Sequence, residues 1–251
     1  MDNRQKIAVE QYTNLANSTS DLANCVGREI DGVGKIIWDD IKLKANIQAG
    51  ETILDLGCGF GEVSLSIYNE STDLDLSVVF VDIQPITKKI LDNWKAKANI
   101  SLVSGIFPDV IDEIEKERRE YDVIVAYSVL HYTDQPKDFI EKAVSLLAPG
   151  GRLFLADLPN INKRGRFVST LSGRSFEANW KNIDISELPI YETHIDFQKN
   201  SEVSTPQIND DLILWSLECF RCLGFDVYVL PQTESLPYCY TREDLLIVRP
   251  Y

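Results

Sequence analysis

The chain has 251 residues, of which 44% are hydrophobic and 25% charged, so it is long enough to bury a full core and has an ordinary globular composition. Its formal net charge of −14 argues against DNA or structured RNA as a partner, because duplex binding needs a dense Lys/Arg face. No apolar run reaches the roughly 18 residues that span a bilayer, and no signal-peptide core opens the chain. Five cysteines, an odd number, are typical of reduced thiols. We therefore expect a cytoplasmic protein.

Residues 1–50 are expected to form an N-terminal helical cap. Apolar side chains recur there at helical spacing, at Ile7, Val9, Tyr12, Leu15 and Ala16, and a second apolar face follows between Ile36 and Leu43. The polar stretch 18–21 separates the two predicted helices and offers residues that cap a helix.

A dense glycine motif follows the first predicted strand, at about 51–56. Glycines stand at every second position, at Gly57, Gly59 and Gly61. Glycine is needed where the backbone takes positive φ or lies against a ligand, so the motif indicates a ligand over a strand-to-helix turn. A dinucleotide fingerprint has the spacing GxGxxG, whereas here GxGxG follows an acid, Asp55.

The segment Asp55-Leu56-Gly57-Cys58-Gly59-Phe60-Gly61 resembles the first motif of the class I S-adenosylmethionine-dependent methyltransferases. The resemblance implies a Rossmann-like, doubly wound α/β fold. Its seven-stranded sheet is mostly parallel, with a C-terminal antiparallel hairpin strand and helices on both faces. The cofactor implied is S-adenosyl-L-methionine, its methionine portion lying over a turn that includes Asp55, Gly57, Cys58 and Gly59.

A second acid supports this interpretation. The apolar strand 77–81 ends at Asp82, which lies 27 residues after Asp55. A carboxylate accepts two hydrogen bonds from a vicinal diol, and in the resembled family this acid holds the ribose hydroxyls. Ile83, the next residue, is expected to contact the cofactor as well. The alternative is an ordinary aspartate at a strand end.

The next strands supply the rest of the expected cofactor site. After strand 100–103, many relatives carry an acid for the adenine amino group, but this chain has Gly105 and Ile106 in its place. Backbone and apolar contacts are then expected to hold adenine. In open parallel sheets ligands collect at the carboxyl ends of strands, so Tyr127 and Ser128, which end the fourth strand, and Tyr132 are expected near the sulfonium.

Helices are predicted over 84–97, 109–120 and 136–147, and a fifth strand over 152–157 follows the turn 148–151, which also resembles the family. The core is assigned to 51–251. Within it, 158–208 contains prolines and scattered aromatics with little periodicity, and is interpreted as a substrate-lid insertion. A helix over 210–223 and strands over 225–230 and 245–248 complete the chain.

Catalysis of methyl transfer requires alignment of a nucleophile with the methyl carbon and, for a hydroxyl, removal of its proton. The two histidines, His131 after the fourth strand and His194 in the predicted lid, are the main candidate bases, with a packing role as the alternative, and Asp157 at the end of the fifth strand is a third candidate. The expected substrate contacts, partly from N-terminal helices that close over the site in the family, are Tyr12, Arg28, Tyr132 and Asp157. Too few acids converge for a metal site, so none is expected.

Three functions from different classes follow. The first is a methyltransferase acting on a small or medium-sized metabolite, with O-methylation favoured and a sugar, glycan or natural-product intermediate as acceptor; N- or C-methylation is the variant left open. The second is a nicotinamide-dependent oxidoreductase, which the GxGxG spacing disfavours. The third is a cofactor-binding protein that has lost catalysis. Nothing in the sequence indicates a nucleic-acid or membrane partner or a homo-oligomer.

Overall fold

The computed structural model describes residues 3–18, 32–200, 208–236 and 238–251. Its helices are α1 (Asn3–Ser18), α2 (Val33–Lys44), α3 (Glu62–Glu70), α4 (Gln84–Asn93), α5 (Ile111–Glu117), α6 (Pro136–Ser145), α7 (Ile161–Val168), α8 (Leu171–Lys181), α9 (His194–Asn200) and α10 (Asp210–Cys222), with short 3₁₀ turns η2 (Leu130–Tyr132) and η3 (Ile185–Glu187). Its strands are β1 (Thr52–Leu56), β2 (Ser77–Asp82), β3 (Ile100–Ser104), β4 (Tyr121–Tyr127), β5 (Leu147–Leu158), β6 (Asp226–Pro231) and β7 (Glu243–Val248).

The strands form one seven-stranded sheet in the order β3-β2-β1-β4-β5-β7-β6. The first five in the chain pair in parallel, and β7 lies antiparallel between β5 and β6. Every residue of β1 is buried, which explains the apolar side chains of Ile53, Leu54 and Leu56, since a central parallel strand is covered on both faces. The predicted doubly wound sheet with a C-terminal antiparallel hairpin is confirmed.

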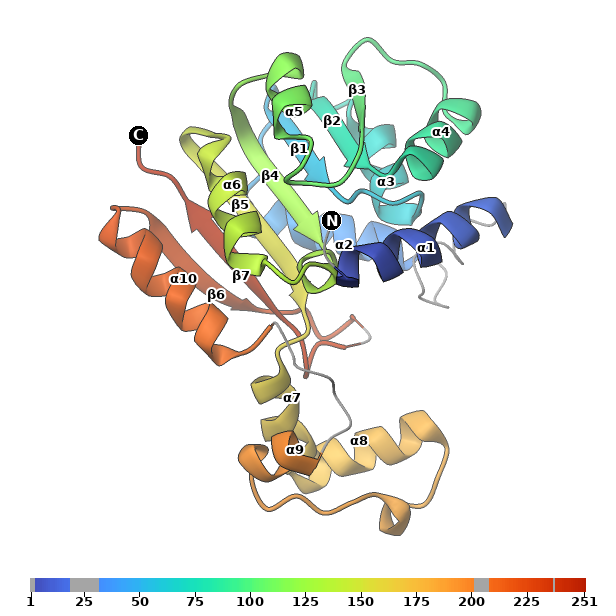
Figure 1. The fold of residues 1–251 in the computed structure, drawn as a ribbon, viewed down its shortest axis with the longest axis vertical. Coiled ribbons are helices and arrows are strands. Elements are labelled where there is room, and N and C mark those ends of the chain that lie inside the picture. Colours follow the sequence, from blue (N-terminus) through green and yellow to red (C-terminus); the bar gives the residue numbers. More distant parts are fainter. Residues whose placement is uncertain (1–2, 19–31, 201–207, 237) are drawn as a thin grey trace.

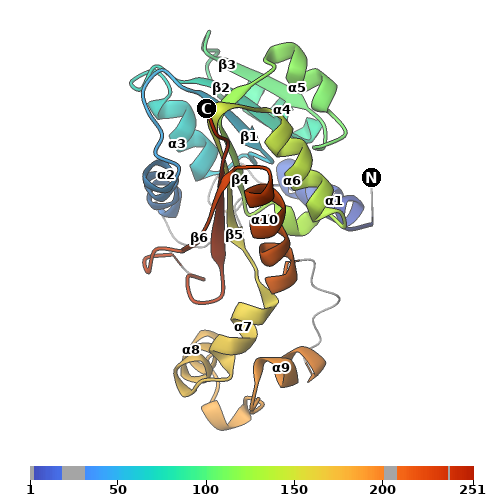
Figure 2. The same ribbon diagram turned by 90° about the vertical axis from the view of Figure 1, so that its left-hand side faces the viewer.

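Helices cover both faces of the sheet (Figure 2). On one face, α5, α6 and α10 pack on side chains such as Leu54 and Ile124, in a continuous buried cluster. On the other, α2 and α3 pack on Ile53 and Phe80, with Trp38 of α2 fully buried among them. Successive residues of β1 therefore contribute to opposite cores, because strand side chains alternate between the faces of a sheet.

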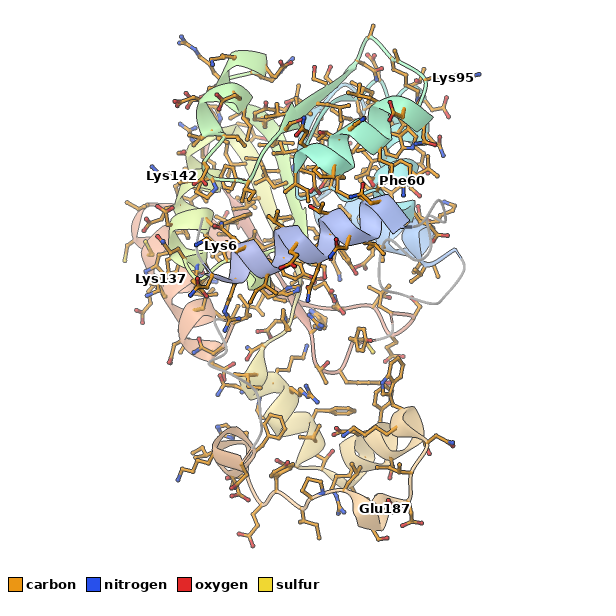
Figure 3. All side chains as sticks on the ribbon, turned by 45° about the vertical axis from the view of Figure 1, so that its right-hand side comes forward. Lys6, Phe60, Lys95, Lys137, Lys142 and Glu187 are labelled. Carbon is orange, nitrogen blue, oxygen red and sulfur yellow. The ribbon has the colours of Figure 1, made fainter. Side chains whose placement is uncertain are left out.

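Helix α1 crosses the carboxyl ends of the parallel strands, between the sheet and the α7–α9 region (Figures 1 and 3). It packs on α4 and on η2. At its C-terminal end Leu15 and Ala16 contact the cluster that contains Phe60, and Figure 3 shows Phe60 beside that end of the helix. The N-terminal segment thus covers the sheet edge at which ligands bind in such folds.

The segment after β5 is helical, where the sequence pattern had indicated an irregular insertion. Helices α7, α8 and α9 extend away from the carboxyl end of the sheet as a separate lobe (Figure 1), which we call the helical lobe and define as residues 161–200. Two caps begin its first helices. The Asn160 side chain accepts from the backbone N–H of Asn162 and Lys163, and Thr170 accepts from that of Gly173.

Some helices end earlier than predicted. Helix α4 ends at Asn93 rather than 97, because Trp94 leaves the helix and packs its ring 4.8 Å from that of Tyr68 and 5.9 Å from that of Phe60. Helix α5 covers 111–117 of the predicted 109–120. Within the described ranges, no helix combines the length and the apolar character that a membrane crossing requires.

Candidate active site

The glycine motif forms a tight turn fixed to the neighbouring strand. The backbone N–H groups of Gly57 and Cys58 both donate to the Val81 carbonyl, at 2.8 and 3.1 Å. Gly57 has φ +72°. A Cβ built on it would lie 2.6 Å from Val129 Cγ2, so a side chain there would collide with the residue that follows β4. Glycine at this position is thus required by both conformation and packing.

Asp82 links the end of β2 to this turn. One carboxylate oxygen accepts from Gly59 N–H at 2.7 Å, and the other accepts from Ile83 N–H at 2.7 Å. A carboxylate has about four lone-pair positions, so each oxygen keeps capacity for a further donor. The geometry leaves Asp82 suited to two adjacent hydroxyl groups.

A cavity opens between this turn and α1. All ten predicted cofactor residues line it, together with Tyr12 and Tyr132. The ten are Asp55, Gly57, Cys58, Gly59, Asp82, Ile83, Gly105, Ile106, Tyr127 and Ser128. Gly59 has φ +67°, and a Cβ built on it meets no atom within 4 Å, so this glycine leaves space that the protein does not fill. An unfilled cradle beside two carboxyl groups fits a cofactor that carries a diol and a cationic amino acid end.

Two buried carboxyl groups give the cavity its electrostatic character. Burial raises the pKa of Asp55 to about 8, and the charge of Asp82 adds to that effect. Burial also raises the pKa of Asp82, to about 6, against the lowering by the hydrogen bonds from Gly59 and Ile83. Near neutral pH the ligand-free site therefore favours a protonated Asp55 and a charged Asp82. A cationic ligand in the cavity would favour the charged forms.

The stability of the ligand-free protein is expected to fall as pH rises. Because the folded pKa of Asp55 is above its ordinary value, the stability it contributes is complete below about pH 4 and is lost as pH rises through about 8. Melting temperatures of the protein and of Asp55→Asn, measured from pH 6 to 9, check this. The difference between them should change across that range, and parallel curves would contradict the assigned pKa.

The far end of the cavity is apolar. Gly105, with φ +151°, donates its N–H to the Asp82 carbonyl at 2.8 Å. Ile106 and Phe107 follow it along the cavity, and the ring of Phe107 packs edge-on against Phe139, with centroids 4.8 Å apart. This end, which lacks the acid found in many members of the resembled family, presents apolar side chains to a ligand.

A pair of tyrosines lines the cavity on the side of α1. Tyr12 of α1 and Tyr132 of η2 join their hydroxyl groups by a hydrogen bond of 2.9 Å, with the rings edge-on at 5.6 Å. The two residues come from segments 120 positions apart. Both had been predicted as acceptor contacts, and the structure brings them together beside the cofactor turn.

Neither histidine lines the cavity. His131 stands beside it, its ring 4.1 Å from that of Tyr132, so its role as a base stays a prediction. His194 begins α9 in the helical lobe, where it packs against Gly165, and the structure does not bring it to the predicted site. Arg28 lies outside the described residues.

Asp157 was expected to contact the substrate, but the structure does not place it in the cavity. It ends β5 as predicted but is only 2% exposed and does not line the cavity. Its side chain accepts from Gln232 at 3.2 Å, and its backbone N–H donates to Asp244 at 2.9 Å. Arg242 donates to its carbonyl at 3.1 Å. These bonds fix the connection between β5 and β7 and keep Asp157 out of the cavity lining.

Sequence reasoning missed part of the lining. Gln5, Ala8 and Val9 of α1 line the cavity with Tyr12. With Tyr12, these residues have the spacing i, i+3, i+4 and i+7, which places them on one face of a helix, and this spacing could have identified them as lining residues. The predicted stripe included Ile7, which is 57% exposed, because it counted only apolar residues and omitted Gln5. Lining residues missed on the other elements are Val63, Val81, Phe107, Thr133 and Phe139.

Comparison with known proteins agrees with this fold. Residues 54–153 match the model of the methyltransferase domain family. The plantazolicin methyltransferase BpumL, solved with a triazolic desmethylPZN analogue and SAH, has the same fold over the full length of both chains, with a TM-score of 0.59 and 14% identity. The chain thus shares its fold with a solved methyltransferase, and its residues 54–153, which include the glycine turn and Asp82, are similar to a methyltransferase domain.

Similar curated proteins include two enzymes of one kind. The mitochondrial ubiquinone biosynthesis O-methyltransferase of Schizosaccharomyces pombe is 30% identical over 118 residues, 45% of this chain and 40% of that protein. The ubiquinone biosynthesis O-methyltransferase of Xanthomonas axonopodis pv. citri is 32% identical over 115 residues, 44% of each chain. The matched region thus spans less than half of these relatives.

Proposed function

We propose that this protein transfers a methyl group from S-adenosyl-L-methionine to an oxygen of a small or medium-sized metabolite. The observation that carries the proposal is the Asp82 carboxylate, held by two backbone N–H groups at the edge of a cavity that the glycine turn leaves open. The bound cofactor supplies an electrophilic methyl on a sulfonium, a good leaving group.

The chain's own residues bind and orient. Asp82 accepts from the ribose hydroxyls, and the turn at Gly59 gives room for the methionine portion. Asp55, which is buried near Asp82, attracts the cationic amino acid end of the cofactor when its carboxyl group is charged. Apolar contacts from Ile106 and Phe107 stabilise the adenine ring. These contacts account for binding without any base.

The acceptor approaches from the side of the tyrosine pair. Tyr12 and Tyr132 offer hydroxyl groups that both donate and accept, which suits an oxygen nucleophile. Helix α1 covers this side and holds the acceptor against the cofactor. Alignment of the acceptor oxygen with the methyl carbon then supplies much of the rate acceleration. The similarity to ubiquinone biosynthesis O-methyltransferases, over less than half of this chain, supports oxygen as the attacked atom.

Calorimetric titration with S-adenosylhomocysteine tests the cofactor assignment, with NADH as the control ligand. Micromolar binding of the first and none of the second is the expected result. A screen with labelled methyl donor and a panel of phenols, sugar hydroxyls and amines then tests the acceptor class. Turnover of amines alone would contradict O-methylation, and binding without turnover of any acceptor would favour a cofactor-binding protein without catalysis.

Tyr12→Phe is expected to lower kcat/KM for the acceptor about tenfold, because one neutral hydrogen bond near the reacting atoms is lost. The affinity for S-adenosylhomocysteine should change less than about twofold, since the ring and its packing remain. The matched control is Tyr228→Phe, on the exposed strand β6. Equal kinetics in the two variants would remove the tyrosine pair from the acceptor site.

A further inference from the structure

The helical lobe contains a second cavity, of about 500 Å³, that the proposed methyl transfer does not use. It shares no lining residue with the cofactor cavity. Helices α7, α8 and α9 and the loop between η3 and α9 supply its walls: Arg164, Val168, Arg174, Glu177, Lys181, Leu188, Pro189, Tyr191, Phe197 and Asn200. Figure 3 shows this lobe as a separate layer of side chains below α1, with Glu187 at its far end.

Basic side chains gather at this cavity in an otherwise acidic protein. The chain carries a net charge of −14, yet residues 161–181 hold five basic side chains and one acidic one. Three of the five, Arg164, Arg174 and Lys181, line the cavity against one carboxylate, Glu177. The cavity thus has an excess of positive charge, which favours an anion.

Glu177 binds two of these cations on a single oxygen. Its Oε1 lies 2.8 Å from Lys181 Nζ and 3.7 Å from Arg164 Nη2. The third cation is held differently. Arg174 donates through Nη2 to the carbonyls of Ile185 and Leu188, at 3.1 and 3.5 Å, while its Nε is buried with no acceptor within the described part of the chain. A buried guanidinium N–H without an acceptor is costly, and an anionic ligand would supply one.

The remaining wall is apolar. Val168, Leu188 and Phe197 are buried there, and the ring of Tyr191 packs edge-on against Phe197 at 5.1 Å. Arg164 lies over the Phe197 ring, 5.8 Å from its centroid, so the basic and the apolar surfaces are continuous. A ligand that fills such a cavity needs an apolar body and one charged end.

We propose that this cavity is a second ligand site, for a small molecule in which an anionic group, such as a carboxylate or sulfonate, is attached to an apolar or aromatic body. The anionic group lies among Arg174, Lys181 and Arg164, and the apolar body lies against Phe197 and Leu188.

The test uses two fluorescent probes on the full chain with its cofactor cavity saturated by S-adenosylhomocysteine. The anionic probe is 8-anilinonaphthalene-1-sulfonate, and N-phenyl-1-naphthylamine is its neutral counterpart without the sulfonate. Lys181→Gln and Arg164→Gln should each weaken binding of the anionic probe about five- to tenfold, since each removes one partly exposed cation from the site. Lys199→Gln, exposed in the same lobe and outside the cavity lining, is the charge-matched control and should leave both probes unchanged.

Glu177→Gln distinguishes this site from simple loss of structure. It removes the only carboxylate on the described wall of the cavity, so the anionic probe should bind about fivefold more tightly while the neutral probe is unaffected. Arg174→Gln removes a loop contact as well as a cation and is therefore accompanied by a melting curve. Equal affinity for the anionic probe in wild type, Lys181→Gln and Glu177→Gln, or parallel changes for both probes, would overturn the proposal.

Discussion

Replacing Asp82 with asparagine is expected to weaken the binding of S-adenosylhomocysteine about 10- to 100-fold, because charge-assisted hydrogen bonds to the ribose are lost. The change keeps the shape of the side chain, and its one remaining oxygen still accepts from Gly59 or Ile83. The amide nitrogen, however, faces the other backbone donor. Calorimetric titration at pH 8, above the pKa of about 6 that burial gives Asp82, measures the effect with the carboxylate charged in the wild type.

The control for this prediction is Asp73→Asn. Asp73 is exposed in the turn after α3, so the substitution changes the net charge equally without touching the cavity. Its affinity for S-adenosylhomocysteine should match that of the wild type. If the Asp82 variant binds as tightly as the Asp73 variant, the ribose does not lie at the end of β2 and the assignment fails.

The cofactor half of the site could be predicted because it depends on local sequence. A buried parallel strand leaves a continuous apolar run, and the turn after it must hold glycine where φ is positive, as at Gly57 and Gly59. The topology then brings the ends of β1, β2 and β4 to one edge. Asp82 and Tyr127 therefore lie near the glycine turn even though no sequence pattern relates them directly.

The helical lobe could not be predicted in the same way. Its side chains pack mainly on one another and leave Leu171, Trp180 and Ile190 exposed, so the segment has no clean division into apolar and polar faces. Single caps at Asn160 and Thr170 begin its helices, a weak signal beside prolines and scattered aromatics. Placing His194 near the methyl group required a lid over the site, whereas α9 lies in the lobe and packs on α7.

Gly59→Ala is expected to abolish tight binding of S-adenosylhomocysteine while the protein remains folded. The added Cβ meets no protein atom within 4 Å, so within the protein its cost is the left-handed backbone at φ +67°, about 1 to 2 kcal/mol. In the complex the same carbon occupies space beside the cofactor. Binding should weaken by at least about 30-fold, since a steric overlap of about 2 kcal/mol or more arises only in the complex, whereas the backbone strain is present with and without the ligand.

Gly224→Ala is the matched control for this backbone strain. Gly224 follows α10 with φ +86°, and its Cβ also meets no atom within 4 Å, but it lies outside the cofactor cavity. Both variants should melt at similarly reduced temperatures, and only the Gly59 variant should lose the cofactor. Similar affinities in the two variants would mean that the turn does not lie against the ligand. A loss of binding confined to Gly59→Ala would instead show that glycine is needed at position 59 for the space it leaves to the cofactor, since the backbone strain is common to both variants.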